Sequence, residues 1–208
     1  MSCEGQVWFP LLLQYEKVWS GRTKIYGQDL VLDGDGEIQK KLQDYVVKIV
    51  KALKIQFGPC HAKVMIDEKG PVLIEIAARV DGISSVSLEE QVCGRSQVQL
   101  TIDAYLCQNK LKELPFTYKR KLFAKVVNFI SHHCGVIVSE NKLQEIKALQ
   151  SFAGMRTRVH TGKKLEKTID LATSPGFAFL AHSDSVQLEN DYAQIRSWEK
   201  EGLLFSLK

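Results

Sequence analysis

The 208-residue sequence has no long hydrophobic run, and a membrane-spanning helix needs about 18 or more consecutive apolar residues. Its longest apolar stretches, residues 9–13 and 176–181, have the length of strands. Residues 1–9 also lack the basic segment and following apolar segment that mark a signal peptide. We therefore expect a cytoplasmic protein that has no membrane partner.

Cysteine spacing and charge excess also exclude several classes of protein. The five cysteines are odd in number and form no Cys-x-x-Cys pair, which argues against a zinc site and favours free thiols in a reducing compartment. Lys and Arg total 28 and Asp and Glu total 24, a net charge of +4. Because the basic residues form only short, scattered clusters, we expect no nucleic-acid partner.

The residue pattern predicts an α+β protein. Hydrophobic residues make up 45% of the chain and charged residues 25%, which are the proportions of a folded soluble domain. A change from helical to strand periodicity after Pro115 predicts two domains, residues 1–114 and 115–208. The predicted strands are 5–16, 23–32, 61–66, 71–77, 122–130, 135–138, 151–159 and 176–181; the predicted helices are 37–54, two within 85–108 split at Gly94, 140–149 and 186–198.

The strand pair 61–66 and 71–77 carries the most informative residues. On the second strand, alternation places Leu73 and Glu75 on one face, so Glu75 stands mid-strand among apolar residues. A buried carboxylate without a partner is costly, and Lys63 or Arg79 could neutralise it. Two readings remain open: a structural ion pair, or a carboxylate that binds a ligand or a metal.

Residues 58–82, GPCHAKVMIDEKGPVLIEIAARVDG, resemble the catalytic β-hairpin of the ATP-grasp carboxylate–amine ligases. The pattern of that family is G-P-x-H-x-E, a turn, G-P-x-L-I-E-x-x-x-R and a later glycine. Three further segments are similar to the C-terminal lobe of its amino-acid-ligase branch: Thr168-Ile-Asp-Leu, Ser174-Pro-Gly-Phe and Asp191-Tyr-Ala-Gln-Ile-Arg. The resemblance covers essentially all 208 residues, but only the C-terminal half of such an enzyme.

The resemblance implies a fold and a set of site residues. The fold is the C-terminal half of an ATP-grasp fold, a mainly antiparallel sheet with packed helices and a small α+β C-terminal lobe. These ligases form an acyl phosphate from a carboxylate and ATP, with Mg²⁺ between the phosphates. Glu75 then corresponds to a magnesium ligand, Arg79 to the catalytic, phosphate-contacting arginine, and Gly82 to a glycine that lets substrate approach. His61 matches a patterned position whose role is unassigned.

Lys63 departs from this pattern, because the family has a magnesium-binding glutamate there. A protonated lysine has no lone pair and carries the same sign of charge as the metal. We therefore expect a Lys63–Glu75 ion pair to fill the metal position, so that ATP and Mg²⁺ bind this chain weakly or not at all. The alternative is an ammonium that replaces the charge of one magnesium ion.

The implied nucleotide clamp lies upstream of the matched half, so we expect a ligase half that is inactive alone and needs a complementing N-terminal half. The alternative is a non-catalytic interaction module that binds a partner through an exposed sheet edge. An uncovered edge strand would expose Val7, Trp8, Phe9 and residues 11–13 and favour a homodimer. The competing expectation is that this segment folds back and is buried within its own lobe.

Overall fold

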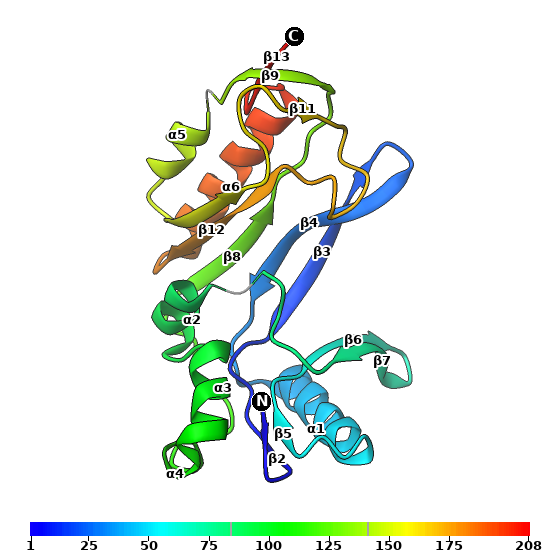
Figure 1. Ribbon diagram of the computed structural model, residues 1–208, viewed down its shortest axis with the longest axis vertical. Helices are drawn as coiled ribbons and strands as arrows, with labels where there is room; N and C mark the ends of the chain where they lie inside the picture. Colours follow the sequence, from blue (N-terminus) through cyan, green and yellow to red (C-terminus); the bar gives the residue numbers. More distant parts are fainter. Residues whose placement is uncertain (84, 141) are drawn as a thin grey trace. The chain divides into compact units, whose positions relative to one another are not determined.

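The computed structural model describes residues 1–83, 85–140 and 142–208, and these residues form two compact units (Figure 1). The first unit contains Met1–Leu12 and Leu32–Lys121, and the second contains Leu13–Val31 and Leu122–Lys208. In the part of the chain so described, no helix is both long and apolar enough to cross a membrane. Compact packing alone does not test the domain division at 114/115, which stays a prediction.

The first unit combines helices with two small antiparallel sheets. Its sheets are β2-β1-β5, formed by β1 (Ser2–Cys3), β2 (Gln6–Val7) and β5 (Phe57–Gly58), and the hairpin of β6 (His61–Asp67) and β7 (Gly70–Ala77). Its helices are α1 (Glu37–Ala52), α2 (Val86–Cys93), α3 (Gln97–Leu106) and α4 (Gln108–Lys112). The predicted break at Gly94 is confirmed, because this residue ends α2 with a left-handed φ of 77°.

Residues 5–16 do not form the continuous strand that the sequence predicted, since β2 ends at Val7 and the next strand begins at Leu13. Trp8 is buried among side chains of its own unit, including Met1 and Leu100, and its indole N–H donates to the carbonyl of Leu114 at 3.2 Å. Val7 is buried as well. The predicted exposure of residues 7 and 8 is therefore wrong, and the chain follows the fold-back alternative because the indole finds both an apolar pocket and a hydrogen-bond acceptor.

The second unit is built on a five-stranded antiparallel sheet. The strand order is β10-β12-β8-β4-β3, formed by β3 (Leu13–Ser20), β4 (Thr23–Val31), β8 (Phe123–Asn128), β10 (Phe152–Thr157) and β12 (Gly176–His182). A smaller sheet, β11-β9-β13, contains β9 (Gly135–Ser139), β11 (Lys164–Leu165) and β13 (Ser206–Leu207), and the helices are α5 (Leu143–Lys147) and α6 (Ser185–Lys200). The predicted mainly antiparallel α+β class is confirmed.

Helix α6 covers one face of the large sheet, where it contacts β12 and β8 (Figure 1). Asp184 starts the helix by accepting a hydrogen bond from the backbone N–H of Val186 at 2.8 Å. The buried side is formed by Leu188, Ile195 and Trp198, which recur at helical spacing and join the apolar residues of β8 and β12 in one core cluster.

Arg196 of α6 ties the β3–β4 hairpin to the rest of this unit. Its guanidinium donates to the carbonyl of Gly27 on β4 and, at 3.1 Å, to the carbonyl of Asn128 on β8, and it pairs with the carboxylate of Glu199. Glu199 is buried and also accepts the backbone N–H of Ile130 at 2.9 Å. One helix turn therefore connects two strands through a charged pair that is largely shielded from water.

We expect Arg196→Met to lower the free energy of unfolding by about 3–5 kcal/mol, because it leaves the Glu199 carboxylate buried and unpaired. Urea denaturation followed by circular dichroism measures this loss. Lys200→Met is the matched control, since its side chain is exposed on the same helix, and it should change stability by no more than about 0.5 kcal/mol. Equal effects of the two substitutions would contradict the role given to Arg196.

Candidate functional site

The β6–β7 hairpin brings three of the predicted site residues onto one face. In the strand register, Lys63 lies directly opposite Glu75, and His61 lies opposite Ala77 at the open end of the hairpin. Residues 61 and 63 are two apart on β6 and therefore point to the same side. The prediction that Lys63 and Glu75 lie on adjacent antiparallel strands and face the same side is confirmed, whereas their ion pair stays a prediction.

A β-bulge interrupts the alternation in β7. Lys63 pairs with Glu75, but the next residue, Val64, pairs with Leu73, so Ile74 is an extra residue in β7. Since Lys63 and Val64 are consecutive on β6, their partners Glu75 and Leu73 lie on opposite faces. The prediction that Leu73 and Glu75 share a face is therefore wrong, because it assumed an unbroken period of two.

The face that carries Glu75 is open to solvent, and the carboxylate does not stand in an apolar interior. Glu75 is exposed, and so are the neighbouring apolar side chains of Met65, Val72 and Ile74. On β7, the backbone N–H of Leu73 donates to the hydroxyl of Tyr45 at 3.1 Å, which links the strand to α1. Water solvates the Glu75 carboxylate, so the predicted cost of burying it does not arise.

The segment after β7 carries Arg79, Asp81 and Gly82. Arg79 is exposed, and its guanidinium donates to the carbonyl of Val80 at 2.8 Å. Asp81 Oδ1 lies 3.6 Å from His61 Nδ1, and only 15% and 16% of these two side chains are exposed. His61 thus lies beside Asp81, so the residues after β7 come close to β6. Sequence reasoning missed Asp81, since no spacing in the pattern connects it with His61.

A chain of hydrogen bonds fixes Asp81 from the other side. Its backbone N–H donates to Gln97 Oε1 at 2.9 Å, at the start of α3. The backbone and side-chain amides of Gln97 donate in turn to the carboxylate of Glu89, at 2.7 and 3.2 Å, and Glu89 is buried on α2. The segment between β7 and α2 is therefore positioned by both helices and by the hairpin.

Gly82 is exposed, and a Cβ built on it would meet no atom within 4 Å. The side chains of this chain therefore give no steric reason for a glycine at this position. The open space is compatible with a group that approaches the backbone there, which is the role that the family resemblance implies.

The hairpin residues do not fit a pair of magnesium ions. Magnesium prefers carboxylate and other hard oxygen ligands, and Glu75 offers one carboxylate, but its cross-strand partner Lys63 presents an ammonium. Across the described ranges, no three His, Cys, Asp or Glu side chains cluster so that they could hold a metal ion.

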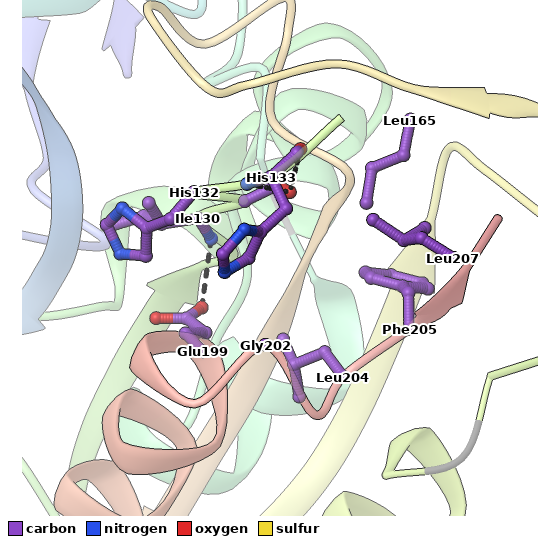
Figure 2. Close-up of a pocket in the computed structure, with 10 residues that line it drawn as sticks. Ile130, His132, His133, Leu165, Glu199, Gly202, Leu204, Phe205 and Leu207 are labelled. Atoms are coloured by element: carbon purple, nitrogen blue, oxygen red, sulfur yellow. Dashed lines mark hydrogen bonds between the residues drawn. The ribbon is translucent and has the colours of Figure 1, made fainter. Parts of the chain in front are cut away.

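A small hollow in the second unit also brings polar groups together (Figure 2). Ser131, His132 and His133 line it together with apolar residues and the carboxylate of Glu199, which accepts the N–H of Ile130. Its volume is about 20 Å³, which holds roughly one water molecule. The hollow is too small for a nucleotide. The candidate site is the hairpin with the segment after it, where the predicted site residues lie.

Comparison with known proteins finds a synthase and several ligases or synthetases to which the chain is similar. It is 29% identical to dapdiamide A synthase of Enterobacter agglomerans over 205 residues, which are 96% of this chain and 47% of that protein. The crystal structure of an L-amino acid ligase from Bacillus licheniformis matches with a TM-score of 0.78 and 20% identity, over 95% of this chain and 50% of the ligase. Phosphoribosylglycinamide synthetase from Anaerococcus prevotii matches with a TM-score of 0.70 and 14% identity, over 98% and 51%.

The chain thus spans about half the length of the relatives that it matches. No family model matches it. The likenesses confirm the predicted fold and the predicted resemblance to ligases that join a carboxylate to an amine.

We expect Gly82→Ala to leave the free energy of unfolding unchanged to within about 0.5 kcal/mol, because the new methyl group meets no atom of the chain. Gly34→Ala is the matched comparison, since a Cβ there would overlap the backbone of Tyr118 and the side chain of Thr117, and it should cost about 1–3 kcal/mol. Thermal melting of both variants measures the difference. A large fall in the melting temperature of Gly82→Ala would contradict the open space around this residue.

His132 should make stability depend on pH. Burial lowers the pKa of His132, and the positive charges of His133, Lys167, Arg196 and Lys200 lower it further from its ordinary value of 6.5. The unfolded chain then binds the proton more readily, so stability falls as pH falls below this value. Urea unfolding between about pH 5 and pH 7 should show this slope, and His132→Gln should flatten it, while His160→Gln, at an exposed position, should not.

Proposed function

We propose that this chain, which has the fold of about half of an ATP-grasp carboxylate–amine ligase, supplies the catalytic-hairpin half of an ATP-dependent ligase site and has no ligase activity alone. The half that it resembles is the C-terminal one. Enzymes of this fold generally use ATP and Mg²⁺. A complementing N-terminal half, in a cytoplasmic compartment, would have to provide the nucleotide clamp.

The observation that carries this proposal is the direct pairing of Lys63 with Glu75. In the pattern that residues 58–82 resemble, both positions hold carboxylates, and the two together neutralise divalent cations. Lys63 replaces one negative charge with a positive one at the same place, a change of two charge units opposite Glu75. The opposite charges of Lys63 and Glu75 favour an ion pair across the strands over metal binding.

The remaining residues support binding and positioning. Arg79 is exposed directly after the hairpin, where its guanidinium could bind a negatively charged phosphate group. His61 and Asp81 hold the following segment in place, and the backbone at Gly82 is open to an approaching group.

Replacing the lysine tests the proposal. Lys63→Glu restores two facing carboxylates, and we expect it to create a saturable Mn²⁺ or Mg²⁺ site, measured by calorimetry with the metal alone. Lys63→Met removes the positive charge without adding a metal ligand and is the matched control. Lys63→Glu combined with Glu75→Gln should lose the new site again.

The same titrations are run on the unaltered chain with ATP, in the presence and absence of magnesium. We expect no saturable magnesium site at Glu75 and no magnesium-dependent gain in ATP affinity. A magnesium site in the unaltered chain that Glu75→Gln abolishes would contradict the reading of Lys63.

A second candidate function is a non-catalytic interaction module. The observation that favours it is apolar surface left exposed in the first unit, on the hairpin at Met65, Val72 and Ile74 and on α3 at Ile102 and Leu106. The two functions differ in one measurable respect: a ligase half gains ATP-dependent ligation when the matching half of a relative is added, whereas an interaction module does not.

A further inference from the structure

We propose that Glu89 and Gln97 are positioning residues of the candidate site: through the backbone of Asp81 they hold Gly82 in place for a negatively charged group that Arg79 binds. This inference rests on the proposed function, in which Arg79 binds phosphate and the backbone at Gly82 is open to an approaching group. Neither Glu89 nor Gln97 belongs to the hairpin pattern of the ligases. Both are buried, so they act on such a group only through other residues.

Packing around Gly82 does not fix its position. The residue is exposed, and a Cβ placed on it would meet no atom within 4 Å. Its two neighbours are fixed instead: the backbone N–H of Asp81 donates to Gln97 Oε1 at 2.9 Å, and the backbone N–H of Ile83 donates to Asp81 Oδ2 at 3.3 Å. The position of Gly82 therefore depends on Asp81, whose backbone is held by the amide of Gln97.

The Glu89–Gln97 pair has a role besides joining α2 to α3. Helix α3 begins at Gln97, and its first backbone N–H has no acceptor within the helix, so Glu89 Oε2 satisfies this donor at 2.7 Å. A second bond is not needed for that purpose, yet Glu89 Oε1 also accepts Gln97 Nε2 at 3.2 Å. This second bond orients the Gln97 amide, because an amide that directs its nitrogen toward Glu89 directs its oxygen away, toward Asp81.

The negative charge of Glu89 decides which way the Gln97 amide faces. A carboxylate only accepts hydrogen bonds, so Gln97 directs Nε2 toward Glu89 and Oε1 toward the N–H of Asp81. With the amide turned over, two acceptors would face each other at Glu89 and two donors would face each other at Asp81. Because Glu89 and Gln97 are buried, such unmatched groups are costly, and a single arrangement of the three residues is favoured.

Exchanging the two side chains tests the proposal. After Glu89→Gln alone, the Gln97 amide can match its new partner only by turning over, and it then loses the N–H of Asp81. Gln97→Glu alone brings two carboxylates together. The double variant Glu89→Gln/Gln97→Glu again provides a donor and an acceptor at each of the three contacts. We therefore expect the single variants to loosen residues 81–83 and the double variant to restore them.

NMR relaxation and amide exchange of the full chain measure this order without any ligand. Exchange of the Asp81 N–H should quicken about three- to tenfold in each single variant and return to its original rate in the double variant. A purely structural role of Glu89 would loosen the amides of α3 as well, whereas we expect Glu89→Gln to leave them unchanged. Glu90→Gln is the matched control, since Glu90 is exposed on the same helix. Circular dichroism confirms that all variants fold.

Titration with inorganic phosphate, followed through the amide signal of Gly82 and the Nε–H signal of Arg79, measures the effect on binding. We expect each single variant of Glu89 and Gln97 to weaken phosphate binding about threefold or more, and the double variant to recover it. Arg79→Gln should abolish phosphate binding but leave the order of residues 81–83 unchanged.

The two measurements separate this inference from the proposed function. An unaltered chain that binds no phosphate would contradict the role of Arg79, and the order of residues 81–83 would still decide the role of Glu89 and Gln97. Order or phosphate affinity that the single variants leave unchanged, or that the double variant does not restore, would overturn the positioning role.

Discussion

The cross-strand register between β6 and β7 determines what the first unit can do. It places Lys63 opposite Glu75 and, with one extra residue at Ile74, turns Leu73 to the other face. Without that bulge, Glu75 would share a face with Leu73 and compete with apolar packing. With it, the exposed Glu75 carboxylate lies on the same face as Lys63.

The two helices that follow the hairpin hold its continuation in place. Glu89 on α2 accepts both amide groups of Gln97, Gln97 accepts the backbone N–H of Asp81, and Asp81 lies beside His61 on β6. A buried carboxylate that is satisfied by an amide pair is a rigid support. The position of Asp81, between Arg79 and Gly82, therefore depends on side chains of β6, α2 and α3.

In the second unit, too, charged side chains hold a helix in place beside an apolar core. The segment Asp191-Tyr-Ala-Gln-Ile-Arg, similar to the amino-acid-ligase branch, has structural contacts here: Asp191 accepts the backbone N–H and the hydroxyl of Ser151 at 2.8 and 2.7 Å, and Arg196 joins Gly27, Asn128 and Glu199. In this chain the segment fastens α6 to the sheet.

The sequence by itself determined the class of the protein, the helices other than α4 and most of the longer strands, because hydrophobic periodicity and turn residues act locally. It also determined the likeness of residues 58–82 to a ligase hairpin and the charge reversal at Lys63, since both depend only on residue identity and spacing. The tertiary structure alone decided the bulge at Ile74, the burial of Trp8 against Leu100 and Leu114, and the pairing of His61 with Asp81. Each of these depends on contacts between residues distant in the chain or on one residue inserted into a strand register, and neither leaves a periodic signal in the sequence.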